Sequence, residues 1–129
     1  MSILLDTCVL LWLSFDQDQL SEAAAEEIRA SGEESWVSAI SAFEIAQKYR
    51  LKKLALPIPA DLWYPQTLRQ HNLREIAITG TVAARSCMLP MIHRDPADRF
   101  LIATALEMDL RLITPDPEIK KYPGVRVVW

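Results

Sequence analysis

Four acidic residues stand at separate points of this 129-residue chain, where a parallel fold could bring them together: Asp6, Glu44, Asp98 and Asp116. Each follows a short apolar run or lies early in the segment after one. Two carboxylates ~4 Å apart repel each other by about 4 kcal/mol at an effective dielectric constant of about 20. A cluster of four therefore needs a cation or a basic partner to stay ionised. Carboxylate oxygens select hard cations, so the pattern predicts a site for Mg²⁺ or Mn²⁺.

Asp6 and Asp116 each have an alternative, structural interpretation. Asp6 precedes a helix expected to begin near Thr7, and an aspartate in that place can cap the helix. Asp116 lies in the stretch 114–117, Thr-Pro-Asp-Pro, where an Asp-Pro pair favours a turn or the cap of a short helix. Neither acid is diagnostic alone, but their shared position after predicted strands indicates a common site.

Glu44 leaves two structural alternatives open. If Ser41 caps the helix, Ser41 and Glu44 form a capping box. Lys48, one turn later, could also pair with the Glu44 carboxylate. If Ser38 is the cap instead, Glu44 lies inside the helix among apolar neighbours, where a carboxylate indicates a function.

Asp95 and Asp98 compete for one position in the predicted site. Asp95 precedes Pro96, and this pair is typical of a helix cap followed by the first helical residue. Asp98 then falls in the first turn, on a face that continues through Leu101 and Ile102. An acid at the head of this core-facing stripe is expected to point toward the sheet edge. We prefer Asp98 as the metal ligand, with Asp95 as the alternative.

The elements predicted along the chain place these acids at one edge of a sheet. Apolar runs predict five strands, at residues 3–5, 35–37, 74–78, 112–113 and 125–128. Helical patterns cover residues 7–14, 22–30, 38 or 41 to about 54, 60–70, 80–88 and 96–108, with a short turn near 118–121. Strands that alternate with helices predict an α/β fold with a mainly parallel sheet covered on both faces. Functional groups gather beyond the carboxyl ends of such strands.

Composition limits the chain to one domain, residues 1–129, with enough hydrophobic residues (50%) for a core. The 14 basic and 17 acidic residues give a net charge of −3, which argues against a general electrostatic binder of nucleic acid. An enzyme that contacts RNA over a small patch remains compatible with this charge. Cys8 and Cys87 lie in apolar stretches and are expected to be buried, reduced thiols of a cytoplasmic protein. We expect neither a signal peptide nor a membrane span.

Four segments, in this order, resemble PIN-domain ribonucleases, in particular VapC-type toxins of bacterial toxin–antitoxin pairs. They are residues 4–7, 38–44, 93–99 and 114–117, and the resemblance extends over essentially the whole chain. It implies a three-layer α/β/α sandwich with about five mainly parallel strands, and an acidic Mg²⁺ pocket. It also implies cleavage of structured RNA, such as tRNA or rRNA. The expected partner is a cognate antitoxin protein, in a homodimer or a larger hetero-oligomer.

The family's acids fall on the same four positions, and the resemblance gives each a role. Asp6 and Asp98 would chiefly hold one or two Mg²⁺ ions, with Mn²⁺ as the alternative metal. Asp116 would be a ligand directly or through water. Glu44 would orient the attacking water or hold a second ion.

Three further residues are candidates for contact with RNA. Thr114 matches a hydroxyl residue that often stands two positions before the last acid of the family. Arg94 and Arg99 flank the predicted site and could hold RNA phosphates, with a solvated helix face as the alternative for Arg99. A non-enzymatic α/β module that only binds a partner is the competing function.

Overall fold

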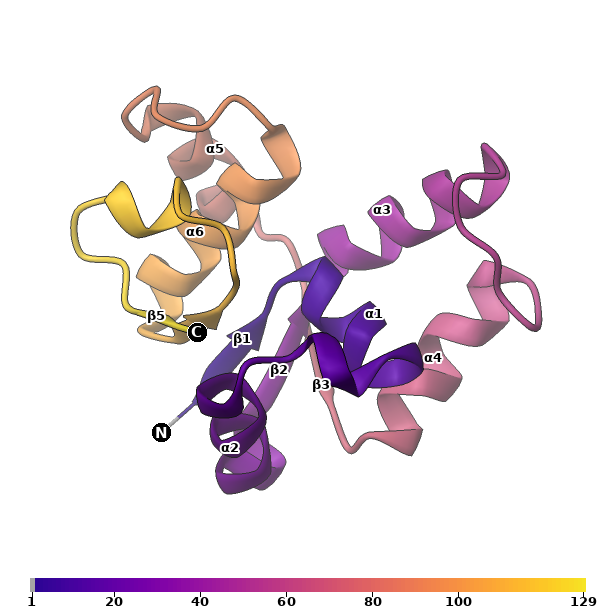
Figure 1. Ribbon diagram of the computed structural model, residues 1–129. Helices are drawn as coiled ribbons and strands as arrows, with labels where there is room; N and C mark the ends of the chain where they lie inside the picture. Colours follow the sequence, from indigo (N-terminus) through magenta and orange to yellow (C-terminus); the bar gives the residue numbers. More distant parts are fainter. Residues whose placement is uncertain (1) are drawn as a thin grey trace.

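A five-stranded sheet forms the centre of the protein in the computed structural model, which describes residues 2–129 (Figure 1). Its strands are β1 (Ile3–Leu5), β2 (Ser35–Ser38), β3 (Arg74–Ile76), β4 (Arg111–Ile113) and β5 (Val127–Val128). Their order across the sheet is β3-β2-β1-β4-β5, and each neighbouring pair is parallel. The predicted α/β fold with a parallel sheet is confirmed.

Helices connect the strands at close to the predicted positions. They are α1 (Thr7–Phe15), α2 (Glu22–Ser31), α3 (Ala39–Arg50), α4 (Ala60–Gln70), α5 (Gly80–Met88) and α6 (Pro96–Met108), with short 3-10 turns η1 (Gln17–Gln19), η2 (Gly32–Glu34) and η3 (Ile119–Lys121). Helix α3 ends at Arg50 and not near residue 54, because Lys52 adopts a left-handed φ of 59° and the Lys53 N–H bonds back to the Lys48 carbonyl. Strand β3 is shorter than predicted, since its partner β2 ends at Ser38, opposite Ile76.

Alternating residues of the strands supply two hydrophobic layers. Ile3 and Leu5 of β1 pack on one face with residues of α1, α2, α3 and α4. Leu4 points to the other face and packs with Leu101 and Ile102 of α6. Helix α5 covers α6 on that side, and Figure 1 shows α1, α3 and α4 across the sheet from it. This arrangement is the predicted three-layer α/β/α sandwich.

The parallel register brings the carboxyl ends of three strands to one edge of the sheet. Leu5 of β1 lies opposite Val37 of β2 and Ile113 of β4. The Asp6 N–H donates to the Ile113 carbonyl at 3.0 Å and extends this pairing by one residue. The residues that follow these three strands are therefore neighbours in space, as the predicted site requires.

The two cysteines are free, and only one fits the prediction of a buried thiol. Cys8 is partly buried in α1, but Cys87 is exposed near the end of α5. Helix α5 buries Val82 and Ser86, and Cys87 is one residue further around the helix, so it faces away from the core. The prediction is wrong for Cys87. Among residues 2–129, no helix has the length and apolar character needed to cross a membrane.

Candidate active site

The structure places the four predicted acids around one hollow of about 230 Å³ at the carboxyl ends of the strands. Its lining residues are Asp6, Thr7, Cys8, Glu44, Lys48, Asp95, Asp98, Pro115 and Asp116. The acids come from four separate parts of the chain: the ends of β1 and β4, helix α3, and the first turn of α6. Their convergence follows from the parallel register.

Asp6 caps α1 and also faces the hollow. Its Oδ1 accepts the Thr7 N–H at 2.7 Å, and its Oδ2 accepts the Thr114 hydroxyl at 2.6 Å. The residue is only 7% exposed. Burial raises the pKa of Asp6, and the two hydrogen bonds offset only part of this effect. Capping and a role in the site are therefore compatible for this residue.

Thr114 supports two acids from inside the protein. Its hydroxyl donates to Asp6 and accepts the Asp116 N–H at 3.1 Å. The Oδ1 atom of Asp116 in turn accepts the Glu118 N–H at 2.9 Å, which gives Asp116 the predicted turn-forming role as well. Thr114 is 1% exposed, so the prediction that it contacts RNA is wrong.

Glu44 lies inside α3 and does not form a capping box. Ser38 is the cap of this helix, and its hydroxyl accepts the Ile40 N–H at 3.1 Å. Ser41 is fully buried, with its hydroxyl 2.8 Å from that of Thr7. The Thr7 hydroxyl contacts Oε1 of Glu44 at 2.5 Å. Burial also raises the pKa of Glu44, which fits a carboxylate held at a site.

Asp98 and Asp116 meet at the ring of His93. The His93 Nε2 atom lies 2.9 Å from Oδ2 of each carboxylate. Ligating atoms of these three residues all lie within 4.8 Å of one another. Burial, followed by the charges of Asp6 and Asp95, raises the pKa of Asp98 to about 7. No role was predicted for His93, although it is the only histidine within the four resembling segments.

Asp95 caps α6, as predicted. Its Oδ1 accepts the Ala97 N–H at 3.0 Å, and Pro96 occupies the first turn. Asp95 is exposed at the rim of the hollow, whereas Asp98 is half-buried beside His93.

Arg99 is buried, and both predictions for its side chain are wrong. It is 6% exposed, so it does not lie on a solvated helix face. Its Nη1 donates to the carbonyls of Pro90 at 3.0 Å and His93 at 3.1 Å, and Nη2 donates to that of Leu89 at 2.9 Å. These bonds commit the guanidinium to the backbone and leave it unavailable to an RNA phosphate. Arg94 is exposed, and its contact with RNA stays a prediction.

The donor set fits a hard divalent cation. Asp6, Glu44, Asp98 and Asp116 present carboxylate oxygens, the ligands that Mg²⁺ and Mn²⁺ prefer. The structure places two basic side chains close to these acids, Lys48 at the hollow and His93 beside it. With Asp95 at the rim, five acids against two basic groups leave an excess of negative charge that a divalent cation would compensate.

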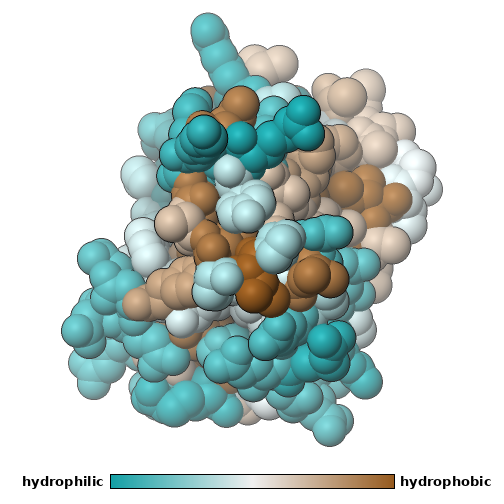
Figure 2. All heavy atoms as spheres, turned by 90° about the vertical axis from the view of Figure 1, so that its right-hand side faces the viewer, coloured by the Kyte–Doolittle hydropathy of each residue, from teal (hydrophilic) through white to brown (hydrophobic). Residues whose placement is uncertain are grey.

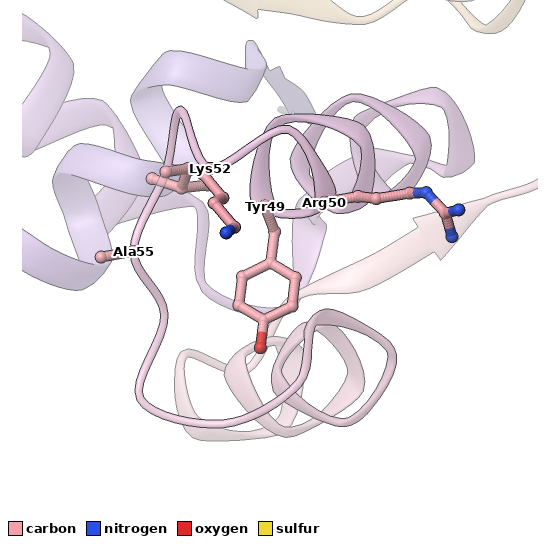
Figure 3. A pocket seen from close by; sticks show the side chains of 5 residues that line it. Tyr49, Arg50, Lys52 and Ala55 are labelled. Carbon is pink, nitrogen blue, oxygen red and sulfur yellow. The ribbon is translucent and has the colours of Figure 1, made fainter.

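A second, larger hollow of about 480 Å³ lies beyond the end of α3 and lacks this donor set. It is lined by Tyr49, Arg50, Lys52, Leu54 and Ala55. Figure 3 shows the Tyr49 ring pointing toward α4, with Lys52 near it and the Arg50 guanidinium pointing away. With cations in place of carboxylates, this hollow is no candidate for the metal.

The chain matches known proteins over nearly its whole length. Residues 3–125 match the family model described as PIN domain. The chain is 38% identical to Ribonuclease VapC22 of Mycobacterium tuberculosis, over 99% of this chain and 98% of that protein.

Solved structures of toxin–antitoxin proteins share the fold. DNA-bound VapBC from Salmonella typhimurium matches with a TM-score of 0.74 and 17% identity, over 98% of this chain and 96% of that one. VapBC2 from Rickettsia felis, bound to a DNA fragment from its promoter, matches with a TM-score of 0.73 and 13% identity, over 98% of this chain and 97% of that one. A toxin–antitoxin complex from Klebsiella pneumoniae matches with a TM-score of 0.67 and 23% identity, over 96% of this chain and 95% of that one.

Proposed function

This chain belongs to the PIN-domain family, and from that premise we propose that it is a metal-dependent endoribonuclease of the VapC type. The observation that carries the proposal is the convergence of Asp6, Glu44, Asp98 and Asp116 on one hollow. Its full-length likeness to a protein named as a ribonuclease supports RNA as the polymer. We propose structured RNA, tRNA or rRNA, as the substrate.

The four acids would have different roles in phosphodiester hydrolysis. Asp6, Asp98 and Asp116 would hold Mg²⁺ or Mn²⁺, because all three line the hollow and ligating atoms of Asp98 and Asp116 lie within 4.8 Å of each other. When bound, the cation supplies a Lewis acid that polarises the phosphate and lowers the pKa of a coordinated water.

Glu44 and Lys48 would act beside the metal ligands. Glu44 is fixed through Oε1 by Thr7 and is partly exposed, so its second oxygen can hold the attacking water. Lys48, one turn further along α3, can balance phosphate charge at the rim. Arg94, exposed near the start of α6, is the remaining candidate for a phosphate contact.

A cognate antitoxin is the proposed protein partner. The structural relatives are VapBC and other toxin–antitoxin complexes. Figure 2 shows the face of α3 and α4, where apolar residues gather within a polar surround. Exposed large apolar side chains within or next to α1, α3 and α4 include Phe15, Phe43, Leu51 and Leu62. Apolar surface of this kind supports a protein contact, within a homodimer or a larger hetero-oligomer in the cytoplasm.

The test is RNA cleavage by Asp6→Asn and Asp98→Asn, with Asp61→Asn as the matched control. Asp61 is an exposed acid on α4, away from the hollow. Loss of a metal ligand should lower Mg²⁺-dependent cleavage by roughly 100-fold or more while circular dichroism stays unchanged. Full activity in either site variant contradicts the assignment.

Metal titration separates the enzyme from a module that only binds a partner. A cation that binds the folded state alone stabilises it by ~2.7 kcal/mol at about 100 times its dissociation constant. The nuclease proposal expects this stabilisation in the wild type and its loss in Asp98→Asn. A protein with neither cleavage nor Mg²⁺-linked stabilisation would be the non-enzymatic module.

A further inference from the structure

The ring of His93 occupies a specific place in the site that the proposed function leaves unexplained. It comes from the segment before α6, and its Nε2 lies 2.9 Å from Oδ2 of both Asp98 and Asp116. A histidine so placed either ligates the cation itself or donates a hydrogen bond to the residues that do. The two roles need opposite states of Nε2, a lone pair or a hydrogen.

The other ring nitrogen distinguishes these roles. The Asp95 N–H donates to Nδ1 of His93 at 3.2 Å, which requires a lone pair on Nδ1. A neutral imidazole with a lone pair on Nδ1 carries its hydrogen on Nε2. Nε2 is therefore a donor, which bonds to Asp116 and lies 2.9 Å from Oδ2 of Asp98, and it is not a metal ligand.

The backbone of His93 is held on both sides by buried polar groups. Its N–H donates to the Tyr122 hydroxyl at 2.8 Å, and its carbonyl accepts from Nη1 of Arg99 at 3.1 Å. Tyr122 is 2% exposed and Arg99 is 6% exposed. Arg99 also contacts the Tyr122 hydroxyl at 3.3 Å. A buried guanidinium needs many hydrogen-bond partners. One partner of Arg99 is the His93 carbonyl, so the bond fixes the backbone of the histidine.

We propose that His93 is a positioning residue, which donates from Nε2 to Asp116, contacts Asp98 at 2.9 Å and so fixes oxygens of both aspartates where the cation would bind. Arg99 and Tyr122 form the brace that holds His93. The inference rests on the proposed metal site. A carboxylate has two oxygens and about four acceptor positions, so each aspartate can accept from His93 and still bind a cation. Hydrogen-bond partners of metal ligands typically contribute about 10- to 100-fold to metal affinity.

The experiment compares Mn²⁺ binding by the full chain and its variants, followed by electron paramagnetic resonance. His93→Ala removes the donor and should weaken Mn²⁺ binding by about 10- to 100-fold. His93→Gln places an amide N–H in the same region and should stay within about threefold of the wild type. Tyr122→Phe keeps the ring of His93 but loosens its backbone, and should weaken binding several-fold. Unchanged Mn²⁺ affinity in His93→Ala overturns the proposal, and unchanged affinity in Tyr122→Phe overturns the brace.

Pulsed resonance on bound Mn²⁺ tests the donor role directly. The proposal expects no directly coordinated ¹⁴N signal in the wild type. A coordinated ¹⁴N signal that disappears in His93→Ala identifies His93 as a ligand and overturns the assignment. Asp98→Asn separates this failure from failure of the metal site itself, because wild-type Mn²⁺ affinity in that variant would refute the site as a whole.

Discussion

Thr114 donates its hydroxyl hydrogen to Oδ2 of Asp6 at 2.6 Å, and so joins the residue after β4 to the residue after β1. The Thr114 hydroxyl oxygen also accepts the N–H of Asp116 at 3.1 Å. Asp6 and Asp116 are 110 positions apart in the sequence, yet the Thr114 side chain bonds to both and fixes their positions. The spacing of the proposed metal ligands therefore depends on a residue that solvent and RNA do not reach.

We expect Thr114→Val to impair the site more than the fold. Valine has nearly the same shape but no hydroxyl, so Asp6 loses a donor and the Asp116 N–H loses an acceptor. Unpaired buried polar groups cost about 1–3 kcal/mol of stability, and lost support of a metal ligand costs about 10- to 100-fold in activity. Urea unfolding and RNA cleavage assays measure the two effects.

Thr114→Ser is the matched control for this substitution. Serine keeps the hydroxyl and removes only a methyl group, so its cleavage rate should stay within a few-fold of the wild type. Equal losses of activity in the valine and serine variants would show that the methyl group, and not the hydroxyl, matters at this position.

Substitutions of Arg99 and Arg94 should differ in their effect on the free energy of unfolding, although the two residues are only five positions apart. Arg99→Met leaves carbonyls of the 89–93 segment without their donor, and we expect a loss of about 3 kcal/mol in the free energy of unfolding. Arg94→Ala alters an exposed side chain and should change stability by about 0.5 kcal/mol or less. Thermal unfolding of the two variants checks this contrast.

RNA binding completes the comparison of the two arginines. Arg94→Ala should weaken the binding of RNA to metal-loaded protein by a few-fold, and the salt dependence should become shallower. Wild-type RNA affinity in Arg94→Ala would remove Arg94 from the phosphate contacts. A stable Arg99→Met protein would contradict the role assigned to the buried guanidinium.

The order of elements and the position of the acids could be predicted from the sequence, because both depend on local patterns. Short apolar runs, Asp-Pro pairs and helical spacing are read within about ten residues. Parallel pairing then brings the strand ends together without any further information. This is why Asp6, Glu44, Asp98 and Asp116 were found together in one hollow.

Roles that depend on distant partners could not be predicted in this way. Arg99 looks like any charged residue early in a helix, and its acceptors belong to a turn whose path has no sequence pattern. Thr114 is assigned by its contact with Asp6, 108 positions away. Ser41 and Glu44 matched a capping box, but Ser38 also fitted the cap, and only the structure distinguished them.

The two cysteines should differ in reactivity. Cys87 is exposed near the end of α5, whereas Cys8 is partly buried beside the acidic hollow. We expect a thiol reagent at neutral pH to modify Cys87 rapidly in the folded protein, and to modify Cys8 only after unfolding. Peptide mass mapping after brief labelling identifies the site. Cys87→Ser should abolish the rapid phase, and rapid modification of Cys8 would contradict the structure.

Stability of the metal-free protein should fall as the pH rises. Burial raises the pKa of Asp98 from 3.8 to about 7, and it also raises the pKa of Asp6 and of Glu44. A group with a higher pKa in the folded state binds more protons there than in the unfolded chain. The free energy of unfolding then decreases as the pH rises from the unfolded value to the folded one. For Asp98 this range extends from about pH 4 to about pH 7.

Melting curves in EDTA at about pH 5 and pH 7.5, for the wild type and Asp98→Asn, test this effect. The asparagine cannot ionise, so the difference between the two proteins reports the contribution of Asp98 together with its effect on His93, whose pKa the Asp98 charge helps to raise. We expect the wild type to lose several degrees more than the variant, since ~1 kcal/mol shifts the melting temperature of a domain this size by about 4 °C. Mg²⁺ should restore the melting temperature of the wild type at the higher pH, because a bound cation favours the ionised carboxylates. It should leave the melting temperature of the variant unchanged. Parallel pH profiles for the two proteins would show that Asp98 ionises as freely in the folded protein as in the unfolded chain.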